Sequence, residues 1–232
     1  MAAARARLVI LEATSPHYRA VAARLQQVSL AEQSRNQVPS QADWDDLHRR
    51  SLYFVAGVAA DGGDDQALEV AASSGITLGD DHTLFSLESH FQISFNSIRE
   101  KFLAKSSVPL ERSKTVEGRG LYVLPGHRSS KLGVLLQAAS ILRASALGYT
   151  HMIALNHGAG LAIAESAGFE RLDISIPNGE HPKYVVVGSL QRALQRLSSG
   201  GMLKGSSTIS WADSLQRLCS EIDDAKSAQS RL

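Results

Sequence analysis

The chain has 232 residues, 44% of them hydrophobic and 20% charged, which is the composition of a soluble globular protein rather than a collagenous or disordered one. Lys and Arg number 24 against 23 Asp and Glu, and the resulting formal charge of +1 does not favour nucleic acid as a partner. The single cysteine, Cys219, cannot form an internal disulfide, so we expect a reducing, cytoplasmic location. The apolar run Leu8 to Leu11 is too short for a signal peptide, and we expect no exported or membrane-spanning segment.

The first elements predicted along the chain are a strand and a helix. Residues 7–12 form a β-branched and leucine-rich run of strand length, and Thr14-Ser15-Pro16 after it is typical of a helix start. From residue 17 to about 34, apolar residues recur at three- and four-residue steps, which predicts a helix with one buried stripe. Residues 36–46 are polar, so we expect a loop that leads into a short turn around Trp44 and Leu47.

A hairpin and an unusual insert follow. The strand-like runs 51–59 and 67–78 flank the turn-rich segment Asp61-Gly-Gly-Asp-Asp, which predicts an antiparallel hairpin. Residues 80–115 carry four of the six phenylalanines of the chain. A structureless loop of that length is improbable inside a compact domain, so we expect short helices that cover another part of the fold.

The second half of the chain alternates strands and helices. The predicted strands are 116–124, 151–156, 172–176 and 184–190, and the predicted helices are 132–147 and 159–167. This order predicts a single α/β domain over residues 1–197. Residues 198–208 have the composition of a linker, and the tail 209–232 has apolar residues at helical steps. We expect the tail to be a docked helix, with a partner-binding or homodimer-forming helix as the alternative.

The segment that carries chemistry is 117–136, where a strand, a polar loop and the start of a helix follow one another directly. The first turn of a helix leaves backbone N–H groups unpaired and carries partial positive charge, so it can bind an anion such as a diphosphate. Two side chains add full charges, two add hydroxyl donors, and a glycine permits close approach of the backbone. The residues that would bind the diphosphate are Arg128, Ser129, Ser130, Lys131, Leu132 and Gly133.

This segment resembles the GCN5-related N-acetyltransferase (GNAT) family. In that family a fourth strand ends in a Leu-Tyr-Val-x-Pro-like segment and runs into an Arg/Gln-x-x-Gly-x-Gly/Ala loop that binds pyrophosphate. Residues 121–125 and 128–133 match this arrangement, except that Lys131 stands where the family usually has its first glycine. A lysine could supply by charge what is lost in backbone approach.

A second part of the resemblance lies in residues 150–169. A fifth strand ends in Asn156 and a helix closes with Gly168-Phe169, as in the family's Asn-x-x-Ala…Gly-Phe segment. In many relatives a tyrosine four residues before the closing Gly-Phe protonates the leaving thiolate, and here Ala164 stands there beside Ile163. The match covers residues 116–190 well, and the preceding elements agree only in order.

The resemblance implies a fold and a binding mode. The fold is a GNAT-like mixed, mostly antiparallel sheet of six or seven strands, with helices on both faces. The sheet opens between the strand ending at Leu124 and the strand ending at Asn156, and the opening would hold the pantetheine of the acyl donor. By analogy with the family, the backbone N–H of Val123 or Leu124, freed at a bulge near the strand end, would donate a hydrogen bond to the thioester oxygen.

The implied activity is N-acyl transfer from acetyl-CoA or another acyl-CoA to a small-molecule amine or amino acid, by direct attack on the thioester. Glu117, at the start of the fourth strand, is the candidate base that takes the amine proton, and a solvated strand-end glutamate is the alternative. The proton donor to the thiolate stays unassigned. No metal is expected, because His151 and His157 are six residues apart without a third ligand at helical spacing.

Two other functions stay open. A fainter likeness connects the chain to acyl-homoserine-lactone synthases and long-chain N-acyl amino acid synthases, which have an aromatic-rich insert and a Glu-x-x-Arg-like entry into the fourth strand. Here the insert is present, but Arg119 follows Glu117 one place early. That likeness implies an acyl carrier protein as the donor partner. The third hypothesis is a non-catalytic acyl-CoA-binding module, which the missing tyrosine favours.

Overall fold

The structure is a computed structural model that describes residues 6–33, 41–60, 68–82, 84–128, 131–179 and 181–199. Two residues of the predicted diphosphate loop, Ser129 and Ser130, lie outside the described residues. Most of the predicted linker and the whole predicted tail with Cys219, residues 200–232, lie outside them as well.

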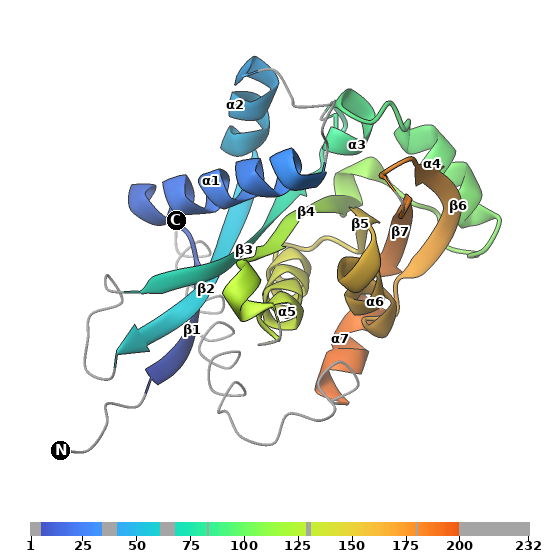
Figure 1. Cartoon of the computed structure of the whole chain (residues 1–232). Coiled ribbons are helices and arrows are strands. Elements are labelled where there is room, and N and C mark those ends of the chain that lie inside the picture. The colour runs from blue at the N-terminus through green and yellow to red at the C-terminus, as the bar shows by residue number, and fades with distance from the viewer. Residues whose placement is uncertain are drawn as a thin grey trace, which may run out of the picture.

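Seven strands form one sheet in the order β1-β2-β3-β4-β5-β7-β6 (Figure 1). Neighbouring strands are antiparallel except for β4 and β5, which are parallel. The sheet is therefore mixed and mostly antiparallel, as predicted. The strands are β1 (Ala6–Glu12), β2 (Ser51–Ala60), β3 (Glu69–Leu78), β4 (Thr115–Val123), β5 (His151–Asn156), β6 (Glu170–Ile176) and β7 (Lys183–Ser189).

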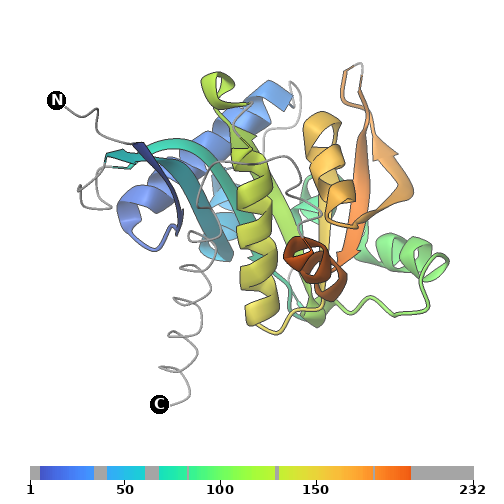
Figure 2. The same cartoon turned by 90° about the horizontal axis from the view of Figure 1, so that it is seen from below.

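Helices cover both faces of the sheet (Figures 1 and 2). We call the side that carries α1 to α4 the α1 face and the side that carries α5 to α7 the α5 face. None of the helices in the described part of the chain is long and apolar enough to cross a membrane. The helices are α1 (Pro16–Gln33), α2 (Gln41–Arg49), α3 (Ser86–Ser89), α4 (Phe95–Leu103), α5 (Leu132–Ala146), α6 (Gly158–Ser166) and α7 (Leu190–Ser198), with short 3-10 turns at Arg112–Lys114 and Pro125–His127.

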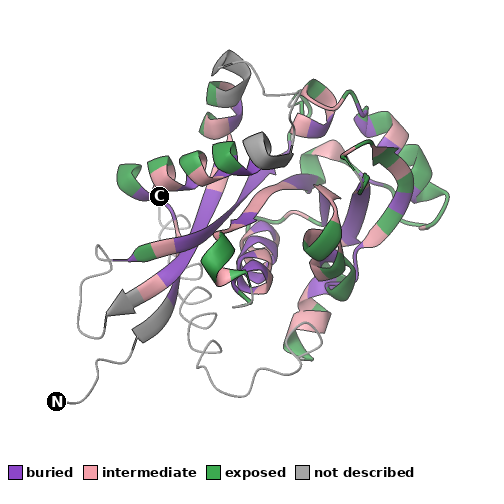
Figure 3. Cartoon of the chain, viewed as in Figure 1, coloured by how far each residue is buried: buried purple, intermediate pink, exposed green. Residues whose placement is uncertain are grey.

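The core is divided by the sheet into layers, because successive side chains of a strand point to opposite faces. Along β5, Met152 and Ala154 belong to the cluster under α5, whereas Ile153 belongs to the cluster under α3 and α4. Figure 3 shows the buried residues concentrated in the strands and on the inner side of α5. The inner strands β5 and β7 are therefore covered on both sides, whereas β6 at the edge has exposed residues.

The aromatic-rich insert forms short helices that cover the sheet, as predicted. Ile98 and Phe102 of α4 are buried against the same cluster as Val185 and Val187 of β7. Glu88 fastens the insert, since its two carboxylate oxygens accept hydrogen bonds from the guanidinium of Arg112. Burial works against the Glu88 charge, but these bonds and two from backbone N–H groups together lower its pKa.

The expected loop over residues 36–46 is wrong for its second part, because α2 occupies Gln41–Arg49. Only Leu47 among the described side chains of α2 is fully buried, at 3% exposure. Trp44 and Leu47 stand a single helical step apart, which is too short a pattern to predict a helix. The helix has further support from Asp46, which forms ion pairs with Arg49 and Arg50 within its last turn and just beyond it.

The sheet opens between β4 and β5, as predicted. The two strands pair only from Thr115–Gly118 with His151–Ala154, so among the described residues the rest of β4 has no strand partner on that side. The opening coincides with an irregularity in β4, where Arg119 pairs with Gly75 but Tyr122 already pairs with Ser73. One extra residue on β4 is left between these pairs, and such a bulge bends the strand.

The bulge lies near the end of β4, as predicted. It falls at Gly120 and Leu121, and Gly120 has a φ of +59°, in the left-handed region that favours glycine. The N–H of Leu124 is not free, because it donates to the carbonyl of Ala71 at 2.9 Å. Leu124 is therefore excluded as the donor to a thioester oxygen, and Val123 stays the candidate.

Candidate functional site

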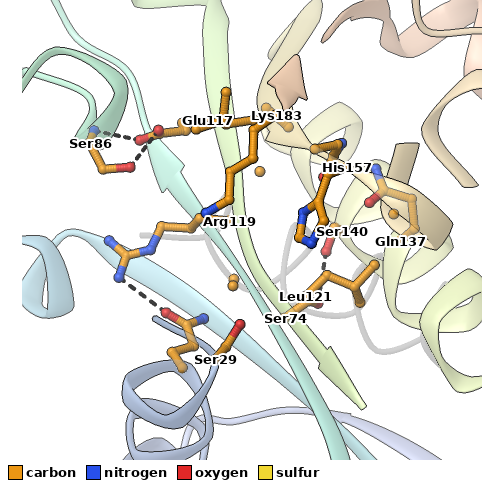
Figure 4. A pocket seen from close by; sticks show the side chains of 18 of the residues that line it. Ser29, Ser74, Ser86, Glu117, Arg119, Leu121, Gln137, Ser140, His157 and Lys183 are labelled. Atoms are coloured by element: carbon orange, nitrogen blue, oxygen red, sulfur yellow. Dashed lines mark hydrogen bonds between the residues drawn. The ribbon is translucent and has the colours of Figure 1, made fainter. Parts of the chain in front are cut away.

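A pocket of about 160 Å³ lies where β4 and β5 separate. Its lining comes from both faces of the sheet, so the pocket passes through the opening (Figure 4). The α1-face side includes Gln26, Ser29, Leu47, Ser86, His90, Phe91, Glu117, Arg119 and Lys183. The α5-face side includes Ser74, Gln137, Ser140, Ala154, Asn156 and Gly160, and Leu121 and His157 also contribute.

Glu117 is buried at the bottom of the α1-face side, with 2% of its surface exposed. Its carboxylate accepts hydrogen bonds from the N–H of Ser86 at 2.7 Å, the hydroxyl of Ser86 and the N–H of Leu87 at 3.0 Å. Burial raises its pKa even though these bonds and the charge of Arg119 favour the ionised form. The alternative of a solvated strand-end glutamate is therefore wrong.

Arg119 lies two residues along β4 and meets α1. Its guanidinium Nη2 donates to the side-chain oxygen of Gln26 at 3.1 Å. Gln26 is 1% exposed, and its Nε2 has no hydrogen-bond partner within the described ranges. A Cβ on Gly75 or Gly120 would lie 2.8 Å or 2.6 Å from this nitrogen. The two glycines therefore make the room in which a polar side chain of α1 reaches the sheet.

Lys183 enters the pocket from the first position of β7. Only 3% of the surface of Lys183 is exposed, and its Nζ lies 5.7 Å from the ring centre of Phe91. Burial lowers the pKa of its ammonium group. No carboxylate of the described residues forms an ion pair with it. The pKa of His157 is also lowered, by burial and then by the positive charges of Lys183 and His181.

The sequence analysis missed Lys183, although a signal for it exists. Lys183, Val185 and Val187 alternate along one strand, and both valines are fully buried. Period-two alternation places the lysine on the same inward face as the valines. The predicted strand begins at Tyr184, one residue later than β7, and therefore leaves this lysine out.

The start of α5 has the geometry of an anion site. Lys131, the residue before the helix, has a φ of +62°, in the left-handed region that favours glycine. This is the position where the resembled family usually has a glycine. The N–H groups of Val134 and Leu135 donate to the carbonyl of Lys131, whereas those of Leu132 and Gly133 have no acceptor in the described part of the chain.

The α5 start lies against the end of β4. A Cβ on Gly133 would lie 3.2 Å from Ile163 of α6 and 3.8 Å from both Leu121 and Val123. Because the Leu124 N–H bonds to β3, the alternation of the ladder points the Val123 N–H the other way, toward the opening. Arg128 is exposed beside it, and its Nε donates to the Val123 carbonyl at 3.3 Å.

The predicted site residues thus form two groups. Glu117 and Asn156 line the pocket itself. Val123, Arg128, Lys131, Leu132 and Gly133 lie at the α5 start and the adjoining end of β4, beside the pocket and not in its lining. Ala164, at the family's tyrosine position, is 1% exposed in the core under α5.

His151, the first residue of β5, and His157, just after that strand, have different surroundings. His151 is buried, its Nδ1 lies 2.9 Å from the hydroxyl of Thr150, and its ring meets the edge of Phe102. It therefore packs in the core, away from His157 in the pocket lining. The described residues contain no group of three His, Cys, Asp or Glu side chains able to hold a metal ion.

Comparison with known proteins gives matches in structure only. No protein-family model and no curated protein sequence matches the chain. An N-acyl amino acid synthase from uncultured soil microbes, FeeM, aligns with a TM-score of 0.57 and 10% identity over 83% of this chain and 96% of that one.

Two further solved structures align with the chain over most of its length. A CoA-dependent acyl-homoserine lactone synthase, MesI, aligns with a TM-score of 0.53 and 12% identity over 86% of this chain and 97% of its own. A proposed N-acetyltransferase from Lactobacillus plantarum aligns with a TM-score of 0.51 and 14% identity over 79% of this chain and 99% of its own. The chain therefore has the fold shared by GNAT acetyltransferases and the acyl-homoserine lactone and N-acyl amino acid synthases.

Proposed function

We propose that the chain is an N-acyltransferase that moves an acyl group from an acyl-CoA to an amine by direct attack on the thioester. The observation that carries the proposal is the opening between β4 and β5, which contains a pocket. Beside it, the N–H groups of Leu132 and Gly133 at the start of α5 have no acceptor among the described residues. A thioester threaded through such an opening would be reached by an acceptor from the other face. The shared fold supports an acyltransferase.

The donor would bind on the α5 face. Its diphosphate would accept hydrogen bonds from the N–H groups of Leu132 and Gly133, with charge from Arg128 and Lys131. The hydroxyls of Ser129 and Ser130 belong to the same proposed loop. The pantetheine would then lie in the opening beside Asn156, whose side chain lies in the pocket lining.

Transfer needs a base and a donor to the thioester oxygen. Glu117 is our candidate base, because a carboxylate has about four lone-pair positions and three are taken by Ser86 and Leu87. Its raised pKa makes it a stronger base toward an attacking ammonium group. The Val123 N–H would stabilise the negative charge that develops on the thioester oxygen. With Ala164 at the tyrosine position, the leaving thiolate takes its proton from another group or from water.

A second candidate is a synthase that takes a longer acyl chain from an acyl carrier protein. The observation that favours it is the insert, which contributes Ser86, His90 and Phe91 to the pocket wall. Arg128 and Lys131 would then meet the phosphopantetheine phosphate and the acidic carrier. A non-catalytic acyl-CoA-binding module is the third candidate, and the buried Ala164 is consistent with it.

Mass spectrometry of small molecules bound to the purified protein, together with thermal shifts, tests these candidates. We expect stabilisation by acetyl-CoA or a long-chain acyl-CoA. A shift with acyl carrier protein alone would support the synthase, and binding without turnover for any acceptor would support the binding module. No shift with any of the three would contradict the diphosphate site.

Replacing Arg128 and Lys131 by alanine tests the donor site directly. We expect acyl-CoA affinity to fall about tenfold or more, because charge-assisted hydrogen bonds to phosphate are lost. Calorimetry measures the affinity, and the double variant Lys101→Ala, Lys105→Ala is a control that removes two exposed charges from the insert. Unchanged affinity in the Arg128 and Lys131 variant would overturn the assignment of the phosphate loop.

A further inference from the structure

The α1-face side of the pocket has an excess of positive charge. Its charged side chains are Glu117, Arg119 and Lys183. The carboxylate of Glu117 already accepts three hydrogen bonds from α3. Arg119 donates to the neutral amide oxygen of Gln26, and Lys183 has no ion pair with a described carboxylate. Lys183 is therefore a buried ammonium group that no carboxylate of the described residues compensates by an ion pair.

A buried cation is unfavourable unless an anion compensates it. A second polar group on this side is also uncompensated, since Gln26 is 99% covered and its Nε2 lacks a partner within the described residues. Both side chains line the same pocket. A ligand that brings an anion with two acceptor oxygens would satisfy the ammonium group and the amide together. The lowered pKa of Lys183 is the expected state of such a site without its anion.

We propose that Lys183 and Gln26 form a carboxylate-binding subsite, so that the acceptor is an amine that also carries a carboxylate, as an amino acid does. The inference deepens the proposed acyl transfer and rests on it for the identity of the ligand. The carboxylate belongs to the acceptor because the donor's phosphates would occupy the α5 face, which leaves the α1 face for the acceptor. Seated there, the carboxylate would hold the amine within the half of the pocket that contains Glu117.

Matched pairs of acceptors test the subsite. Leucine, phenylalanine and serine are compared with isopentylamine, phenethylamine and ethanolamine, which lack the carboxylate. Turnover is measured as release of the coenzyme A thiol, and binding as the shift in melting temperature. For at least one pair we expect kcat/KM or affinity to be about tenfold or more higher for the acid, since a charge-assisted pair is lost in the amine. Equal behaviour of acid and amine in every pair would overturn the proposal.

The variants Lys183→Met and Gln26→Glu localise the effect. Methionine keeps the length of the lysine without its charge, and we expect the preference for the acid to disappear while binding of acyl-CoA is kept. Glutamate at position 26 would place an internal carboxylate beside Arg119, and we expect it to weaken the acids about tenfold without lowering the melting temperature. Lys101→Met, at an exposed position of α4, is the matched control and should change neither. A Lys183→Met variant that lowers the rate for acids and amines equally would contradict the subsite.

Two further arms separate the possible sources of failure. Succinyl-CoA and butyryl-CoA differ by a terminal carboxylate, so a Lys183-dependent preference for succinyl-CoA would assign the subsite to the acyl group and overturn the acceptor assignment. Stabilisation by acids without any effect of acyl-CoA would sink the proposed acyl transfer but keep the subsite. Stabilisation by acyl-CoA with no difference within the acceptor pairs would sink the subsite alone.

Discussion

The two sides of the pocket differ in where their polar groups come from. On the α5 face, the groups proposed to bind the acyl donor are mostly main-chain N–H groups. They lie at the start of one helix and the end of one strand, in residues close in sequence. On the α1 face they are side chains from α1, α3, β4 and β7, such as Gln26 and Lys183. The first kind of site leaves a contiguous sequence pattern, and the second is assembled only when the chain folds.

Removal of the candidate base on the α1 face should have the largest effect on activity. Replacement of Glu117 by Gln is expected to lower kcat by roughly a hundredfold to ten-thousandfold, because general base catalysis contributes on this scale. The affinity for acyl-CoA should be unchanged, since the groups proposed to bind acyl-CoA lie on the α5 face. Stopped-flow or steady-state thiol release measures the first and calorimetry the second. Full activity of the variant, once its folding is verified by circular dichroism, would rule out Glu117 as the base.

Gly120 lies in the bulge of β4 and lines the pocket. Its replacement by Ala should lower the free energy of unfolding by roughly 2–4 kcal/mol. The cost has two sources, a left-handed backbone at φ +59° and a Cβ that would lie 2.4 Å from the Cδ of Gln26. Urea unfolding measures the change. Gly126→Ala is the control, because nothing lies within 4 Å of its Cβ, and it should cost far less. Similar losses in both variants would disprove the packing role of Gln26.

The charge on the α1 face gives a pH dependence. The pKa of Lys183 is lowered by burial in the folded protein, so below that pKa folding carries the full cost of burying the charge, and between it and the ordinary value of 10.5 the unfolded chain binds more protons at this group. Stability should therefore rise with pH through the window between the folded pKa and the ordinary value of 10.5. Lys183→Met should be more stable than the parent at pH 7, and its advantage should shrink toward pH 10.5. Urea unfolding across this range would show a constant difference if Lys183 is not a buried cation.

The smallest expected effect concerns the α5 face. Lys131→Gly should stabilise the fold by up to about 1 kcal/mol relative to Lys131→Ala, because only glycine relieves the left-handed φ of +62°. Both variants lose the same charge, so the difference isolates the backbone. Equal melting temperatures for the two variants would show that this conformation costs nothing at the start of α5.

Local sequence patterns predicted most strands and helices well, but they did not predict α2 or the hydrogen bonds at the end of β4. Apolar runs of strand or helix length, bounded by glycine or polar residues, predicted β4, α5, β5 and α6 within one residue at each end. The helix α2 was missed, since Trp44 and Leu47 give only one helical step within a polar segment. Of the two N–H groups expected to reach the thioester oxygen, those of Val123 and Leu124, the second is excluded, because pairing with β3 directs it to the carbonyl of Ala71.

The sequence by itself determined the order of strands and helices and the candidate anion segment at the start of α5, because these depend on neighbouring residues, whereas the mixed sheet and its opening were expected from the family resemblance. Only the tertiary structure decided that Ser86 and Leu87 bind Glu117 and that Gln26 meets Arg119, contacts that span 31 and 93 residues of the chain. It also decided that Lys183 is buried in the pocket without an acid partner among the described residues. Side chains brought together over such separations share no local pattern, since the sheet and the packing of α1 and α3 set their distances.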